Sequence, residues 1–150
     1  MTERPPIRPA QPDDVAAVAR LSRAVRQACL PYLPDLHTPE EDLWFFRNRV
    51  FPNCEIWVAG KDPLVGFCAH QLGWIEHLYV DSAHQGLGLG CAFIAQAIEK
   101  HAELRLWAFQ KNTAAIRFYE ARGFRLVEQT DGSRNEEKEP DALYRWRREP

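Results

Sequence analysis

The stretch Leu78-Tyr79-Val80-Asp81-Ser82-Ala83-His84-Gln85-Gly86-Leu87-Gly88-Leu89-Gly90 decides which fold this chain adopts. An apolar strand pattern runs into a glycine-rich turn, and the turn runs into an apolar helix over residues 91–100. A strand, a glycine loop and a helix in this order present several free backbone N–H groups, and the helix N-terminus adds about half a positive charge. Glycines allow close approach and positive φ. The stretch therefore predicts a site for a cofactor that carries a diphosphate.

The spacing of the glycines narrows the choice of cofactor. Gly86, Gly88 and Gly90 form G-x-G-x-G, which is not the G-x-G-x-x-G dinucleotide fingerprint. A Walker loop needs Lys and then Ser or Thr after its last glycine, whereas this chain continues with Cys-Ala. The pattern that fits is Gln/Arg-x-x-Gly-x-Gly/Ala over residues 85–90. The alternative to a phosphate site is an ordinary tight turn between a strand and a helix.

A second stretch, Asn112-Thr113-Ala114-Ala115-Ile116-Arg117-Phe118-Tyr119-Glu120-Ala121-Arg122-Gly123-Phe124, follows a strand-like segment. Its Asn suits a helix N-cap and its Gly a left-handed C-cap. The two stretches, in this order, resemble the acyl-CoA loop and the Asn-x-x-Ala-x-x-Phe-Tyr-x-x-x-Gly-Phe signature of the GNAT superfamily of N-acetyltransferases. Residues 56–130 carry the resemblance well, and the N-terminal part carries it by pattern only. Taken alone, Tyr119 would be interpreted as a half-buried core aromatic.

The resemblance implies a fold as well as a function. We expect a single GNAT N-acetyltransferase domain over residues 1–150, an α/β (α+β) fold with a mixed six- to seven-stranded sheet and about four helices. Strands 74–80 and 104–109 would splay apart after a bulge and leave a slot for the acyl-CoA. The last two strands would form a hairpin with residues 130–141 as its loop. The residues alone also favour a mixed sheet, because the middle of the chain is hairpin-like and helices alternate with strands later.

Turn and cap signals place the individual elements. Asp13-Asp14 precedes an amphipathic apolar stripe, and Thr38-Pro39-Glu40-Glu41 combines an N-cap, a Pro at N1 and a capping box. The expected strands are 7–10, 56–59, 64–71, 74–80, 103–109, 124–129 and 142–147, and the later helices are 88–102 and 112–122.

Composition excludes several classes of protein. With 150 residues, 45% hydrophobic and 27% charged, the chain is typical of one globular domain. Its net charge of −2 gives no footprint for nucleic acid or an anionic membrane. No apolar run approaches the ~20 residues that a spanning helix needs, and the first residues have no apolar leader core. Four scattered cysteines indicate reduced, buried thiols in a cytoplasmic protein without a metal site. A homodimer is left open.

The resemblance also implies which residues hold the cosubstrate, acetyl-CoA. Gln85 stands where Arg is commoner and Leu87 where a basic residue is frequent, but backbone N–H groups do most of the binding. The implied cofactor-binding residues are Leu78, Tyr79, Val80, Gln85, Gly86, Leu87, Gly88, Leu89, Gly90, Asn112, Ala115, Phe118 and Tyr119.

Acetyl transfer from a thioester to an amine needs a base for the amine and an acid for the departing thiolate. By resemblance Tyr119 is that acid. Glu76 is the candidate base, because period-two alternation puts it on the strand face of Leu78 and Val80. Glu76 could instead orient the substrate, have a structural role or simply be exposed. His77 would point away and is interpreted as structural.

The acceptor side is the least specified. His37, Glu76 and Asp131 are the candidate substrate-binding residues, with His37 as a second candidate base. The acidic stretch 130–141 is either a solvated turn or a rim that attracts a cationic amine. The expected activity is transfer of an acetyl group from acetyl-CoA to a primary amine of a small molecule or peptide, by direct attack in a ternary complex.

Other functions fit the same fold. One alternative is an enzyme of the same fold that uses a different acyl donor or transfers the acyl group to a hydroxyl. The alternative outside enzymology is a GNAT-like acyl-CoA-binding domain with a sensor or partner-binding role and no transferase activity. The intact glycine loop and Tyr119 argue against it.

Overall fold

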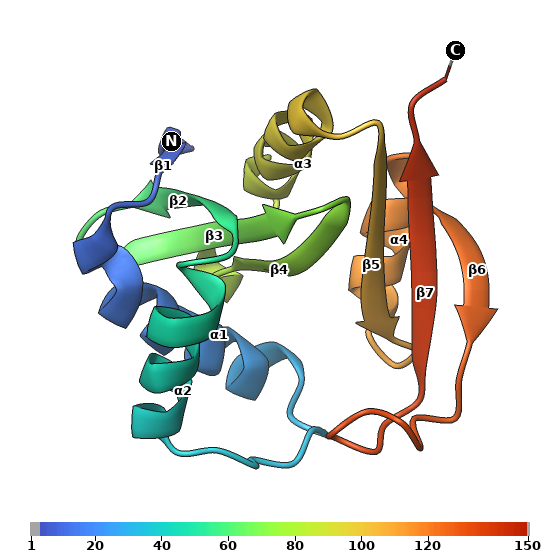
Figure 1. Cartoon of the computed structure of the whole chain (residues 1–150), viewed down its shortest axis with the longest axis horizontal. Helices are drawn as coiled ribbons and strands as arrows, with labels where there is room; N and C mark the ends of the chain where they lie inside the picture. Colours follow the sequence, from blue (N-terminus) through green and yellow to red (C-terminus); the bar gives the residue numbers. More distant parts are fainter. Residues whose placement is uncertain (1–3, 150) are drawn as a thin grey trace.

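The structure is a computed structural model that describes residues 4–149. Its centre is a mixed seven-stranded sheet of order β1-β2-β3-β4-β5-β7-β6 (Figure 1). Neighbouring strands are antiparallel except β4 and β5, which are parallel. This confirms the predicted mixed α/β fold. The strands are β1 (Ile7–Pro9), β2 (Glu55–Gly60), β3 (Leu64–Gln71), β4 (Trp74–Val80), β5 (Glu103–Phe109), β6 (Arg125–Gln129) and β7 (Asp141–Arg147), and the described α-helices are α1 (Val15–Cys29), α2 (Pro39–Phe45), α3 (Leu89–Lys100) and α4 (Thr113–Ala121).

Two helices begin at the caps that the sequence predicts. The Thr38 hydroxyl accepts the backbone N–H of Glu41 at 3.1 Å, and the Glu41 carboxylate accepts that of Thr38 at 2.9 Å. At α4, Asn112 Oδ1 accepts the N–H of Ala115 at 3.3 Å. Gly123 ends that helix with φ at +92°. These side-chain and glycine caps confirm the predicted helix starts and the predicted stop.

The start of the first helix differs from the sequence prediction. Asp14 does not cap α1 through its side chain; its carboxylate accepts the backbone N–H of Gln11 at 2.7 Å and pairs with Arg8. A short 3₁₀ turn over Pro12–Asp14 therefore precedes α1. The second helix continues past α2 as a π-helical segment over Phe46–Val50. That segment turns Phe46 and Val50 into the core.

The sheet separates two hydrophobic cores. Along β3, Phe67 and Ala69 belong to the core under α1 and α2, whereas Cys68 between them belongs to the core under α3 and α4. This alternation is the period-two pattern of a strand buried on both faces. α3 and α4 therefore cover the face of the sheet opposite to α1 and α2.

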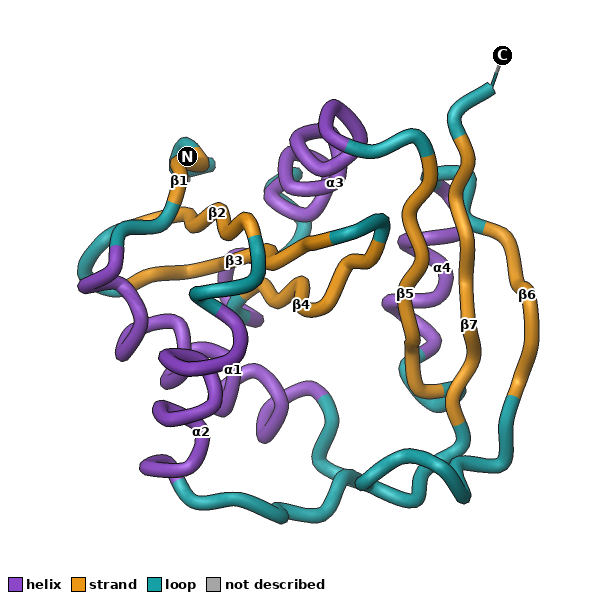
Figure 2. Tube along the Cα trace, in the orientation of Figure 1, coloured by secondary structure: helices purple, strands orange, loops and turns teal. Residues whose placement is uncertain are grey.

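The sheet is split between β4 and β5. The two strands share one registered pair, Trp74 with Arg105, whereas β5 pairs with β7 over its whole length. The Arg105 N–H donates to the carbonyl of Gly73 at 2.8 Å at the same end. Figure 2 shows β4 and β5 diverging away from this contact. The predicted splay of strands 74–80 and 104–109 is therefore confirmed.

The cysteines correct one expectation. All four are free, but Cys68 alone among them is buried, and Cys29 is exposed. Most of the four lie in apolar sequence patterns, but Cys29 follows the last buried residue of the α1 stripe and faces solvent. None of the helices within residues 4–149 combines the length and the apolar run that a membrane span requires.

Candidate active site

The glycine loop sits where β4 ends beside the split. After Val80, the chain makes a short turn over Ser82–His84 and reaches the loop. Gln85 folds back, and its Nε2 donates to the carbonyl of Val80 at 3.0 Å. Gly86 and Gly88 have φ of +82° and +88°, which other residues rarely adopt. This loop geometry is the one that the glycine spacing predicts.

The first turn of α3 has no side-chain cap. Its N-cap is Gly88, and there is no acidic residue in that turn. The first N–H groups of a helix have no partner within the helix, so they are free to bind an anion here. A Cβ added at Gly86 would meet nothing within 4 Å, so the loop opens into free space. These features fit a diphosphate group.

Gly90 brings α3 and α4 together. A Cβ at this position would lie 2.8 Å from the ring of Phe118, which is closer than carbon atoms pack. Phe118 and Ala115 contact the core under α3 and α4, and Asn112 caps α4. The predicted cofactor residues at and within α4 thus lie beside the start of α3. Three of them also have structural roles, since Phe118 and Ala115 pack against the core and Asn112 caps the helix.

Tyr119 lies in the core next to the split. Its side chain is 9% exposed and packs edge-on against Phe118 and Phe124, with ring centroids 5.4 Å apart in each pair. Burial, and then the neighbouring Cys68 and Tyr79, raise the pKa of the Tyr119 phenol. The hydroxyl therefore keeps its proton at any working pH, which is the form that a general acid needs.

A cavity of about 870 Å³ opens on the opposite face of the split sheet. Three residues of β4, namely Glu76, His77 and Tyr79, line one wall, and Trp107 and Phe109 of β5 line another. The rest of the wall comes from α1, from the segment that joins α1 to α2, from α2 and from the loop between β6 and β7. The cavity thus spans both halves of the sheet.

A bulge corrects the predicted direction of the β4 side chains. Ile75 pairs with His70 and His77 pairs with Ala69, so Glu76 has no partner residue on β3. The extra residue interrupts the alternation. As a result Glu76 lines the cavity together with His77, whereas Leu78 and Val80 pack into the core under α3 and α4. Glu76 reaches the predicted slot, but not on the strand face of Leu78 and Val80.

His77 is a second polar residue of the cavity wall. From the sequence, His77 is interpreted as a structural residue that points away from the site. Its ring lies among Phe45, Phe46, Phe67 and Tyr79, with ring centroids 5.2–6.3 Å apart. Burial, helped by the charge of Arg26, lowers the pKa of His77 to about 4. The imidazole is therefore neutral at physiological pH and adds no positive charge to the cavity.

This depression of the His77 pKa predicts an acid-sensitive fold. Because the folded pKa lies below the unfolded value of about 6.5, the stabilisation is complete above pH 6.5 and is lost as the pH falls towards 4, a change of about 3 kcal/mol. We expect His77→Phe, which keeps an aromatic ring, to remove most of this pH dependence. Urea unfolding of both proteins at pH 7 and pH 4.5 measures it, and equal losses in the two proteins would contradict it.

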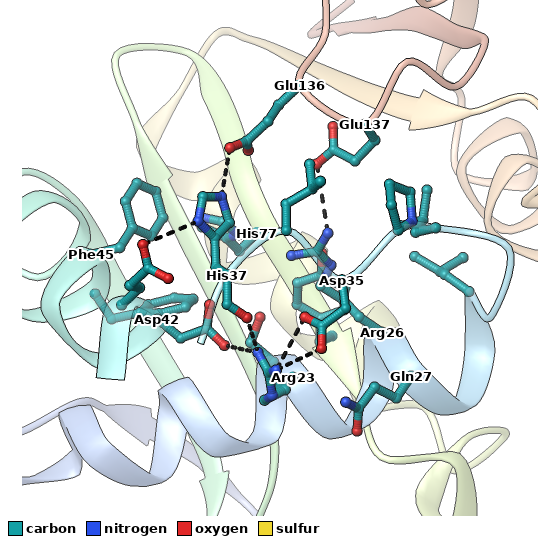
Figure 3. Close-up of a pocket in the computed structure, with 18 of the residues that line it drawn as sticks. Arg23, Arg26, Gln27, Asp35, His37, Asp42, Phe45, His77, Glu136 and Glu137 are labelled. Carbon is teal, nitrogen blue, oxygen red and sulfur yellow. Dashed lines mark hydrogen bonds and ion pairs between the residues drawn. The ribbon is translucent and has the colours of Figure 1, made fainter. Parts of the chain in front are cut away.

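Two ion pairs connect segments that are distant in sequence across the mouth of the cavity (Figure 3). His37 Nε2 lies 2.5 Å from Glu136 Oε1, and Arg26 Nη2 lies 3.6 Å from Glu137 Oε1. Arg23 binds Asp35 and Asp42 and donates to the carbonyl of His37, so it fixes the segment between α1 and α2. We call this connection the loop bridge.

The loop bridge involves one predicted residue and several that the sequence did not single out. His37 lines the cavity as expected, but Asp131 does not; its carboxylate accepts the N–H of Ser133 at 2.9 Å in an exposed turn. Glu136 and Glu137 take the place proposed for Asp131. Nothing in the sequence marked Arg23 or Arg26 as a functional residue, because arginines are common on the polar face of an amphipathic helix.

The segment from residue 22 to residue 124 matches the model of the acetyltransferase (GNAT) family. The chain belongs to this family. The match ends before the loop between β6 and β7, so Glu136 and Glu137 lie outside the part of the chain that defines a GNAT protein. The glycine loop and α4, by contrast, lie within the matched segment.

Similar proteins support the assignment to the GNAT family. The chain is 32% identical over 84 residues to the peptidyl-lysine N-acetyltransferase YiaC of Escherichia coli (strain K12). The matching region covers 55% of this chain and 58% of YiaC. The matching region is thus just over half the length of that relative.

Several solved structures share the fold. Apo YjaB from Escherichia coli superposes with a TM-score of 0.76 at 20% identity, covering 94% of this chain and 96% of that one. The PaiA N-acetyltransferase of Thermoplasma acidophilum in complex with coenzyme A gives 0.73 at 17% identity, covering 95% and 98%. YncA from Salmonella typhimurium with acetyl-CoA gives 0.70 at 16% identity, covering 99% and 96%. At these identities the likeness establishes the fold alone.

Proposed function

We propose that this protein transfers the acetyl group of acetyl-CoA to a primary amine, by direct attack in a ternary complex. The observation that carries the proposal is the charge of the cavity. Two arginines line it against six carboxylates, namely Asp35, Glu41, Asp42, Glu76, Glu136 and Glu137. A primary amine is a cation at neutral pH, so a cavity of this charge attracts it.

The internal ion pairs leave part of this negative charge uncompensated. Arg23 is occupied by Asp35 and Asp42, and Arg26 faces Glu137. Of the remaining three carboxylates, Glu41 and Glu136 have His37 as their one ion-pair partner within residues 4–149. Glu76 has no ion-pair partner within the same residues. Glu76 is therefore the best placed group to receive the ammonium ion of an acceptor.

The chain's own residues account for the steps of the reaction. The N–H groups of the loop and of the first turn of α3 would hold the diphosphate, and acetyl-CoA supplies the acyl thioester. Glu76, directly or through one water, would take the proton that the amine must lose before it attacks. Tyr119, whose burial raises its pKa, would give a proton to the departing thiolate. An acyl-CoA held in the split of the sheet would lie between Glu76 on the cavity side and Tyr119 in the core under α3 and α4, an arrangement that would favour in-line attack.

The rim of the cavity bears on the kind of amine. Leu36, Trp44, Phe45 and Trp107 all line it and are 43–54% exposed. Apolar surface around an acidic interior suits an amine on an apolar stem, such as a lysine side chain. The relative YiaC is named a peptidyl-lysine N-acetyltransferase, which supports the same choice.

An acceptor panel tests the proposal. Acetyl-CoA consumption would be measured with lysine-containing peptides, peptides with a free N-terminal amine, polyamines, aminoglycosides and amino acids, and the products identified by mass spectrometry. We expect turnover with at least one cationic primary amine, and little with the same compound methylated to a quaternary ammonium. Tight acetyl-CoA binding without turnover of any acceptor would favour a sensor or partner-binding role instead.

The Glu76→Gln substitution tests the proposed base. We expect kcat/KM to fall roughly 10- to 100-fold at pH 7, within or just below the range for general base catalysis. Part of the loss should return at high pH, where the amine is already neutral. Asp131→Asn, which removes a carboxylate outside the cavity, is the control. A loss of equal size at every pH would make Glu76 a binding or structural group, and wild-type activity would remove it from the site.

A further inference from the structure

The glycine loop lacks a positive side chain of its own. Gln85 and Leu87 are uncharged, and the amide of Gln85 is bound to the carbonyl of Val80. Gly88, the N-cap of α3, has no side chain to offer. Charge at the loop therefore has to come from other parts of the chain, and two arginines reach it.

The first of them precedes β1. Arg4 Nη1 donates to the carbonyl of Gly88 at 3.3 Å, although 84 residues separate the two. The same atom would lie 3.5 Å from a Cβ at Gly88, so the guanidinium lies directly against the N-cap. A guanidinium has five N–H donors, and this contact uses one of them.

The second arginine follows α4. The guanidinium of Arg122 stacks over the ring of Phe118 at 4.5 Å. Its Nη2 and Nε donate to Cys91 Sγ, at 2.6 and 3.1 Å, in the first turn of α3. Phe118 itself packs on Gly90. The aromatic ring thus holds Arg122 beside the start of α3.

This arrangement is electrostatically incomplete without an anion. The N-terminus of a helix is itself positive, so cations placed there are destabilising unless a negative charge balances them. The first turn of α3 contains no acidic residue, and within residues 4–149 neither Arg4 nor Arg122 forms an ion pair. By contrast Arg8, four residues after Arg4, is paired with Asp14 at 2.9 Å.

We propose that Arg4 and Arg122 bind phosphate groups of coenzyme A, and that Arg4, which precedes β1, therefore belongs to the cofactor site. They supply from outside the loop the charge that Gln85 and Leu87 do not. The inference rests on the proposed function only in taking coenzyme A as the ligand. Because both arginines act on binding, they are expected to change KM for acetyl-CoA and to leave kcat nearly unchanged.

Calorimetry with two ligands tests the proposal. Coenzyme A and dephospho-coenzyme A, which lacks the 3′-phosphate, would be titrated into wild type, Arg4→Gln, Arg122→Gln and Arg125→Gln. Arg125 lies on β6, at the opposite edge of the sheet from β1, and is the charge-matched control. We expect the dissociation constant for coenzyme A to rise roughly 5- to 30-fold in the first two variants and to be unchanged in the control.

The two ligands also locate the contact. A loss seen with both ligands assigns an arginine to the diphosphate, and a loss seen only with coenzyme A assigns it to the 3′-phosphate. The affinity of the Arg4→Gln variant should also depend less steeply on salt, since one ion contact is gone. Thermal unfolding checks that Arg122→Gln keeps its fold, and Arg4 is exposed, so its substitution leaves the core intact.

The outcomes separate this inference from the proposed function. Wild-type affinity of Arg4→Gln and Arg122→Gln for both ligands, with coenzyme A still bound, would overturn the inference and leave the acetyltransferase proposal standing. A wild-type protein that binds neither ligand would overturn both.

Discussion

Replacing Tyr119 with Phe is expected to lower kcat roughly 10- to 1,000-fold while the affinity for coenzyme A stays nearly unchanged. The substitution removes one hydroxyl and keeps the ring that packs against Phe118 and Phe124. Because burial raises the pKa of the phenol, Tyr119 is protonated throughout the working range. It is therefore available as a proton donor when the thiolate departs, and it would recover its proton from solvent afterwards.

Rapid-quench measurement of a single turnover, with calorimetry for coenzyme A, separates chemistry from binding. Tyr144→Phe is the matched control, since Tyr144 is another buried tyrosine of the same core. Equal single-turnover rates in wild type and Tyr119→Phe would assign Tyr119 to packing. A raised dissociation constant with an unchanged rate would make it a cofactor contact.

Replacing Gly88 with Glu is expected to abolish measurable binding of acetyl-CoA. The residue is the N-cap of α3 with φ at +88°, so any side chain here is strained, and a carboxylate would lie at the positive helix end where the diphosphate is proposed to bind. Charge repulsion adds to the strain. The Arg4 side chain nearby would be drawn to the new carboxylate and away from the ligand.

Gly88→Gln separates the two effects, because it has nearly the same size and the same backbone strain without the charge. We expect it to bind acetyl-CoA more weakly than wild type but more tightly than Gly88→Glu. Calorimetry gives the affinities, and circular dichroism shows whether α3 persists. Wild-type affinity in Gly88→Glu would exclude the loop as the phosphate site.

The parts of the fold that the sequence predicted correctly depend on local chemistry. Asn112 can cap only a helix that starts after it, and Gly123 has the positive φ that its place after α4 requires. The glycines at 86 and 88, with φ of +82° and +88°, determine the turn into α3 in the same way. Each of these signals acts within a few residues, so one sequence is enough to read them.

The parts that were wrong or absent depend on contacts between distant residues. The resemblance implied a bulge before the splay, but its position at Glu76 is set by how β4 registers with β3, and no residue type marks it. His37 and Glu136 are 99 residues apart, and Asp131 was as good a candidate as Glu136 until the loop was folded. Arg4 reaches Gly88 across a similar separation. Side-chain pattern cannot predict such pairs, because nothing local depends on them.

The single pairing of β4 with β5 divides the sheet into two hydrogen-bonded ribbons, β1 to β4 and β5 to β6. The strands within each ribbon are joined by their own backbone hydrogen bonds. Beyond the pair of Trp74 and Arg105, the backbones of β4 and β5 are not paired with one another. An acyl-CoA bound between β4 and β5 would connect the two ribbons where the polypeptide itself makes no backbone pairing. The two ribbons would then open and close as one cooperative unit, with the ligand as a structural member of the folded state.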